Sequence, residues 1–153
     1  MTRAATVLLL LAPLLAACSG GEQDGAKGAY VSAATGVCER ARADSAALAP
    51  AATPAELSRF VDGTVAIAER ARGELVALTP PPADAAELRA KVLDPYAALV
   101  TAGQAYAAQV RSAGTDQAKL LPLLGQQPTA EGIDRAYLRS YGLGVCADLL
   151  ESR

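Results

Sequence analysis

The side chains able to do chemistry in this 153-residue chain are cysteines, tyrosines and carboxylates, because the sequence contains no histidine. The lack of histidine removes Ser-His-Asp triads, histidine general bases and histidine metal ligands together. Zinc would need cysteines and carboxylates alone, and these are not clustered along the chain. The composition therefore predicts a protein that is not an enzyme and that holds no metal or cofactor.

Cys18 ends the sequence Leu-Ala-Ala-Cys, in which an aliphatic residue and two small residues precede the thiol. Arg3 stands before an apolar run over residues 4–17, which has signal-peptide length and is short for a transmembrane helix. This order of features resembles bacterial lipoprotein precursors. The resemblance implies removal of residues 1–17, lipid on the Cys18 sulfur, and a place on the outer face of the cell membrane. The alternative is an ordinary signal peptide followed by a chance cysteine.

Cys38 and Cys146 remain as an even pair once Cys18 is assigned to lipid. In an oxidising compartment such a pair favours a structural disulfide. A bond that closes a loop of roughly 100 residues stabilises a fold by about 4–5 kcal/mol in the chain-entropy model. The alternatives are a redox pair, which usually lies close in sequence, and two free thiols.

Charged residues are nearly balanced, with a net charge of −2 and no basic stripe, so we expect no nucleic-acid partner. Glu87 and Lys91, four residues apart, are typical of an exposed helix pair. Nothing in the spacing selects two carboxylates that face one cleft, as acid/base catalysis requires. The chain also lacks a Gly-x-Ser-x-Gly elbow and a glycine-rich phosphate loop.

The first elements that must position the cysteines are a tether and a helix. Residues 18–28 are glycine-rich, polar and aperiodic, which predicts a flexible tether ahead of a domain over residues 29–153. From about residue 29 to residue 49 apolar side chains recur at steps of three and four, which predicts a helix. Cys38 flanks this stripe, and Pro50 ends the helix.

The second helix has a clear start signal in Thr53, Pro54 and Glu56, which are typical of an N-cap, a first helical position and a capping box. A run of three prolines stops it. Gly63 and Gly73 lower its helix propensity, and we expect them to allow a neighbouring helix to approach closely.

The third helix opens at Asp84, the expected N-cap, and ends at Gly114. Pro95 lies inside it and deprives the Lys91 carbonyl of its usual hydrogen-bond donor. Because the apolar register continues through the proline, we predict one kinked helix. The alternative is a new helix capped at Asp94.

The last stretch is broken. We expect a short helix over residues 116–124 that Pro122 interrupts, a polar turn over residues 125–129, and a helix over residues 130–141. Gly142 is typical of a glycine C-cap that is followed by its hydrophobic contact.

Four leucines in this stretch exceed what one face of a short helix can bury. They are Leu120, Leu121, Leu123 and Leu124, and Pro122 lies among them. One interpretation is that they close an end of the bundle, and the other is that they form a docking surface. Tyr96, Tyr106, Tyr137 and Tyr141 are expected at the edge of the core, with ligand-cavity lining as the alternative.

No stretch alternates apolar and polar residues like a strand, so the predicted fold is all-α, an up-down four-helix bundle with a kinked third helix and a broken fourth helix. In that arrangement the first and fourth helices are neighbours, which agrees with the Cys38–Cys146 pairing. The cysteine in the first helix, the Pro-rich breaks and Tyr-Gly-Leu over residues 141–143 resemble small Ala-rich helical lipoproteins of actinobacteria. That resemblance brings no catalytic or binding residue.

The sequence therefore predicts a lipid-anchored, non-enzymatic interaction or accessory module of the cell envelope. Its partners would be the membrane, through the lipid on Cys18, and an envelope protein. The alternative is a carrier that holds an apolar ligand or lipid between its helices, which would require a cavity of several hundred Å³.

Overall fold

The computed structural model of the protein describes residues 20–151, in which all regular structure is helical. In chain order the elements are α1 (Gly20–Ala47), α2 (Pro54–Ala77), α3 (Ala85–Leu88), the π-helical turn η1 (Arg89–Leu93), α4 (Asp94–Ala113), α5 (Gln117–Leu124), α6 (Arg135–Tyr141) and α7 (Gly144–Glu151). This confirms the predicted all-α class. The leader and Cys18 lie outside the described residues.

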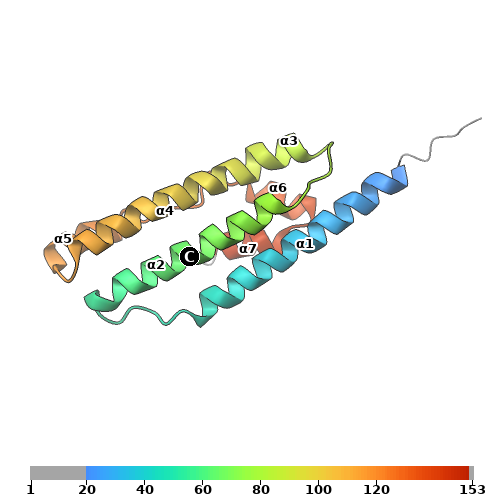
Figure 1. The fold of residues 1–153 in the computed structure, drawn as a ribbon. Helices are drawn as coiled ribbons and strands as arrows, with labels where there is room; N and C mark the ends of the chain where they lie inside the picture. Colours follow the sequence, from blue (N-terminus) through green and yellow to red (C-terminus); the bar gives the residue numbers. More distant parts are fainter. Residues whose placement is uncertain (1–19, 152–153) are drawn as a thin grey trace, which may run out of the picture.

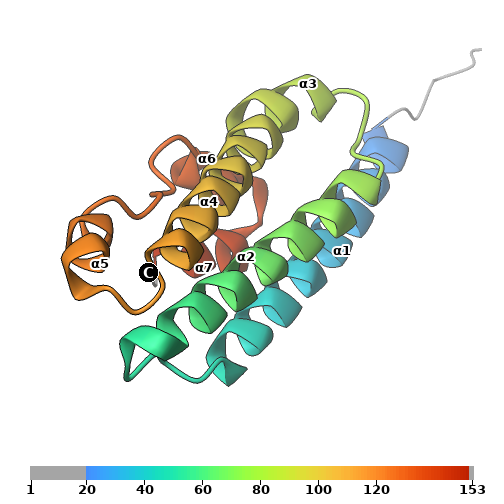
Figure 2. The same ribbon diagram turned by 60° about the vertical axis from the view of Figure 1, so that its left-hand side comes forward.

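Three long helical runs form the frame of the molecule (Figure 1). α1 packs on α2, and α2 packs on α4, so that α2 is the middle helix of a row, as Figure 2 shows. α7 packs against α1 and α6, while α5 packs against α4 at the other end of the molecule. The predicted up-down four-helix bundle is not confirmed, because the helix count differs and three short helices take the place of a single fourth one.

The buried apolar side chains form two clusters. The larger one joins α1, α2, the α3–η1 turn, α6 and α7, and the smaller one joins α2, α4 and α5. The larger cluster is rich in alanine, with Ala34 and Ala147 fully buried, so the helices approach one another closely there. The short helices α6 and α7 are therefore packed into the same core as α1 and α2.

The start of α2 forms as predicted. Thr53 is the N-cap and Pro54 is the first helical residue. The backbone N–H groups of Ala52 and Thr53 donate to the Glu56 carboxylate at 2.9 and 3.0 Å. These bonds lower the pKa of the Glu56 carboxyl. The carboxylate of Glu56, at the third helical position, thus fixes the residue at which α2 begins.

Pro95 does not break the third helical run. The backbone widens into the π turn η1, in which the N–H of Asp94 donates to the carbonyl of Arg89, five residues earlier. The Lys91 carbonyl, which the proline leaves without an intrahelical donor, accepts instead from the N–H of Asp134 at 3.1 Å. The helical run from α3 through η1 to α4 is therefore continuous, as the sequence predicts. Asp134, in the loop before α6, supplies the hydrogen-bond donor that Pro95 lacks.

α1 begins earlier than the sequence predicts. Residues 20–28, which we expected to be flexible tether, are the first turns of this helix. Extending a formed helix avoids the cost of nucleation, so a polar, glycine-rich sequence can continue it. A contact between the Lys27 ammonium and the Tyr141 ring, with 4.4 Å to the ring centroid, ties this part of α1 to α6.

The broken C-terminal stretch also differs in detail. Pro122 lies inside α5 without interrupting it, and α6 begins at Arg135 rather than at residue 130. The reason is the N-cap, since the Asp134 carboxylate accepts from the N–H of Tyr137 at 2.8 Å. Gly142, at a φ of 103°, ends α6 as the predicted left-handed C-cap.

Candidate functional site

The disulfide joins α1 to α7. Cys38 and Cys146 are bonded, with their Cα atoms 5.2 Å apart, and both residues are buried. This confirms the predicted pairing. Because the two cysteines are 108 residues apart, the bond closes most of the described chain into one loop. Its burial in the larger core cluster indicates a structural cross-link rather than an exchanging redox pair.

The cavity beside the disulfide is small. It has a volume of about 40 Å³ and apolar walls from α1, α2, η1, α6 and α7, with Cys38 and Cys146 among the lining residues. Ligand pockets usually measure about 300–1,000 Å³. Tyr96 also lines this cavity, and its hydroxyl donates to the carbonyl of Ala68 at 3.2 Å. The space between these helices is thus too small for a lipid or another sizeable apolar ligand.

Tyrosines gather at the end of the molecule where α3 begins. Tyr141 stacks on Tyr137 with 5.6 Å between ring centroids, and Tyr30 meets Tyr141 edge to face at 6.2 Å. The Tyr141 hydroxyl donates to the Asp84 carboxylate at 2.7 Å. Burial, and then this bond, raises the pKa of Tyr141 well above its usual value. Asp84 stands at the predicted N-cap of α3, but its side chain makes no capping hydrogen bond there and accepts one from the Tyr141 hydroxyl instead.

Lys91 contacts the second ring of this tyrosine stack. Its ammonium lies 4.7 Å from the centroid of the Tyr137 ring and bonds to Glu87 at 2.8 Å, which confirms the predicted helix pair. The hydrogen bond to Glu87 is the main cause that raises the pKa of Lys91. Asp134 is a second, more distant partner at 3.8 Å. Each ring of the stacked pair thus contacts a lysine, Tyr141 with Lys27 and Tyr137 with Lys91.

Charge pairs between helices are features that the sequence analysis missed. They run across the α1–α2 and α2–α4 contacts and comprise Arg40 with Glu74, Arg70 with Asp44, and Arg111 with Asp62. The first two pairs border a groove of about 220 Å³ between α1 and α2. Since each arginine there is paired with a carboxylate, the groove offers a ligand no net charge. Helical spacing along one element does not reveal partners on another.

The four leucines of the predicted docking surface divide into two sets. Leu120 is 5% exposed and belongs to the smaller core cluster, against which Leu123 also packs. Leu121 is 67% exposed and Leu124 is 49% exposed. We call these last two residues the α5 leucine pair. Part of the segment thus closes the end of the core, and the remainder is apolar surface.

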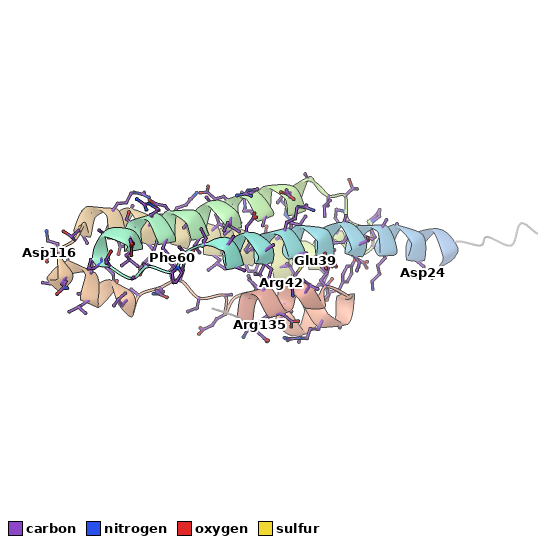
Figure 3. All side chains as sticks on the ribbon, turned by 90° about the horizontal axis from the view of Figure 1, so that it is seen from below. Asp24, Glu39, Arg42, Phe60, Asp116 and Arg135 are labelled. Atoms are coloured by element: carbon purple, nitrogen blue, oxygen red, sulfur yellow. A yellow bond between two sulfur atoms is a disulfide. The ribbon has the colours of Figure 1, made fainter. Side chains whose placement is uncertain are left out.

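The α5 leucine pair lies far from the start of α1. Figure 1 shows α5 and the first turns of α1 at opposite ends of an elongated molecule. Figure 3 shows the same separation from another side, with Asp116 near one end and Asp24 at the other. Val76, 55% exposed on α2, is an apolar residue of similar exposure that lies outside α5.

None of the helices within residues 20–151 is both long and apolar enough to cross a membrane. In the same part of the chain, no group of three or more His, Cys, Asp or Glu side chains is placed to hold a metal ion. Neither a scan against protein-family models nor searches of curated proteins and of solved structures find a match for the chain.

Proposed function

We propose that the protein is a lipid-anchored, non-enzymatic interaction module on the outer face of the cell membrane. The observation that carries the docking part is the α5 leucine pair, which exposes two large apolar side chains on one short helix. The exposed residues Gln126 and Gln127 follow this helix in the chain, and apolar surface rimmed by polar residues is typical of a contact site for another molecule.

The anchoring part of the proposal rests on the sequence around Cys18. A basic leader, an apolar run and a cysteine after two alanines occur in the order typical of lipoprotein precursors. The Cys38–Cys146 disulfide supports export, because disulfides form and persist mainly in oxidising compartments. The finer description of the fold, an up-down bundle whose fourth helix is broken, is part of the same proposal. It is supported by the three long runs and by α6 and α7 beside them.

The carrier function that the sequence left open gains no support from the geometry. A carrier for an apolar ligand needs a cavity several times larger than the one of about 40 Å³ beside the disulfide. The larger groove of about 220 Å³ between α1 and α2 is bordered by charged side chains, which do not suit an apolar ligand. We therefore propose only the interaction module.

The docking part is tested by Leu121→Ser combined with Leu124→Ser in the full chain. Both side chains are largely outside the core, so we expect an unchanged helical spectrum and an unchanged melting temperature. Val76→Ser is the matched control, since it removes an equally exposed apolar side chain from another helix. Partner recovery is measured by chemical cross-linking in intact cells, followed by purification and quantitative mass spectrometry.

The proposal expects the α5 double variant to lose cross-linked partner by about tenfold or more, as residues at the centre of an interface usually do. Val76→Ser should retain the wild-type level. Equal recovery from wild type, control and double variant would exclude the α5 leucine pair as the docking surface. Unfolding of the double variant would show that the two leucines belong to the core.

A further inference from the structure

The first turns of α1 project beyond the rest of the protein. In Figure 3 Asp24 lies past the ends of the neighbouring elements, and Figure 1 shows the same helix end standing clear of α3 and α6. Asp24 and Ala26 are exposed, and a side chain at Gly25 or Gly28 would meet nothing within 4 Å. This extension is thus surrounded mainly by solvent.

Its sequence is a poor helix former. Glycine stands at positions 20, 21, 25 and 28, and glycine is the least favourable ordinary residue inside a helix. Continuation from a formed helix removes the nucleation cost, and Asp24 is favourable near the positive end of the helix dipole. A contact with the body of the protein further stabilises such a segment in one conformation.

Lys27 supplies that contact. Its ammonium lies 4.4 Å from the centroid of the Tyr141 ring. The ring itself is fixed, because it stacks on Tyr137 and its hydroxyl donates to Asp84 at 2.7 Å. A cation over the face of a fixed aromatic ring is attracted by the ring quadrupole. The contact couples the projecting turns of α1 to α6.

We propose that the Lys27–Tyr141 contact is a latch that keeps residues 20–28 helical, so that this segment is a rigid spacer between the membrane and the domain. The spacer role rests on the proposed lipid at Cys18, two residues before α1. α1 has 28 residues and is therefore roughly 42 Å long. A rigid spacer in line with it directs the α5 leucine pair away from the membrane. The partner of that pair is then a protein, and not the lipid of the anchoring membrane.

The latch is tested by amide hydrogen exchange on the membrane-purified protein in lipid nanodiscs. The amides of residues 24–28 are the ones to measure. The first four N–H groups of a helix have no intrahelical acceptor, so residues 20–23 are not protected by the helix itself. Lys27→Gln keeps a similar helix propensity and removes the cation. We expect exchange of these amides to accelerate about twofold to fivefold, the effect of losing one cation–π contact. Lys119→Gln in α5 is the matched control and should leave them unchanged.

Two results of this experiment would overturn the latch. One is exchange of residues 24–28 at the rate of an unstructured peptide in the wild-type protein. That result would show that the segment is a flexible tether, as the sequence predicts. The other is equal protection in Lys27→Gln and wild type, which would show that the segment is helical without the lysine.

The orientation is tested by energy transfer from tryptophan to headgroup-labelled lipid, because the chain contains no tryptophan of its own. Ala26→Trp places the probe in the spacer, and Leu121→Trp places it in the α5 leucine pair. A rigid spacer predicts strong transfer from position 26 and weak transfer from position 121. Equal transfer would contradict it. Protein that does not stay with the nanodiscs would refute the lipid anchor, while the exchange measurement would still decide the latch.

Discussion

At the level of single residues, a cysteine pair and a tyrosine stack hold distant parts of the chain in place, and a capping glutamate fixes the start of α2. The pairing of Cys38 with Cys146 followed from the number of cysteines, and the role of Glu56 followed from its distance to Thr53. The sequence did not separate Leu121 from Leu120, because their exposure depends on how α5 lies against α4. Nor did it assign Asp84 to Tyr141, since that bond joins residues 57 positions apart.

Two of the buried tyrosines, Tyr106 and Tyr141, lead to opposite predictions for removal of the hydroxyl. Tyr106 is buried in the smaller cluster, and its hydroxyl has no hydrogen-bond partner among the described residues. Tyr106→Phe should therefore raise the free energy of unfolding by about 1 kcal/mol, because it removes an unsatisfied polar group. Tyr141→Phe should lower it by about 1–3 kcal/mol, because Asp84 loses its donor.

Urea unfolding of both variants beside the wild type measures this difference. A loss of stability in Tyr106→Phe as large as that in Tyr141→Phe would show that the Tyr106 hydroxyl makes a favourable bond in solution.

At the level of helices, existence was easier to predict than exact limits. The long helices follow from apolar periodicity and strong caps, which are local signals. The start of α6 depends on Asp134. Its side chain caps the helix by accepting from the N–H of Tyr137, and its own N–H donates to the carbonyl of Lys91 in η1. That second bond comes from packing, so no local pattern in residues 130–141 reveals it.

The two glycines of α2 differ in their surroundings, which gives a matched pair of tests. A Cβ at Gly73 would meet nothing within 4 Å, whereas a Cβ at Gly63 would lie 2.9 Å from Leu48 Cδ2. The side chain that approaches Gly63 belongs to Leu48, which follows the end of α1, so neither glycine shows the close approach of a neighbouring helix that the sequence led us to expect. Gly73→Ala should raise the free energy of unfolding by about 0.5–1 kcal/mol.

Gly63→Ala should yield a smaller gain than Gly73→Ala, because the Leu48 side chain must shift to make room. Thermal unfolding of both variants gives the comparison. An equal gain at the two positions would show that the Leu48 side chain moves aside without cost.

At the level of the whole molecule, the all-α class was predictable because strand patterns are missing from the sequence. The assembly of the C-terminal part was not. Three short helices share one side of the α1–α2–α4 row, and their places depend on the disulfide, on the tyrosine stack and on Leu120 in the smaller cluster. These are contacts between distant segments, and their geometry is set only when the chain folds.

The disulfide should dominate the stability of the molecule. Its loop spans 108 residues, so replacing both Cys38 and Cys146 by serine should lower the free energy of unfolding by about 4–5 kcal/mol in the chain-entropy model. This is a large share of the roughly 5–15 kcal/mol typical of a folded domain. The measurement is urea unfolding of the double variant, with the reduced wild-type protein as control. A loss below about 1 kcal/mol would mean that the helices hold together without the cross-link.

The most direct test of the whole account is the mass of the N-terminal peptide of the protein purified from its own membranes. A lipid-anchored module predicts a mature chain that begins at Cys18 and carries a diacylglycerol on its sulfur. A chain that begins at another residue, or an unmodified Cys18, would contradict the proposed anchor and the function built on it.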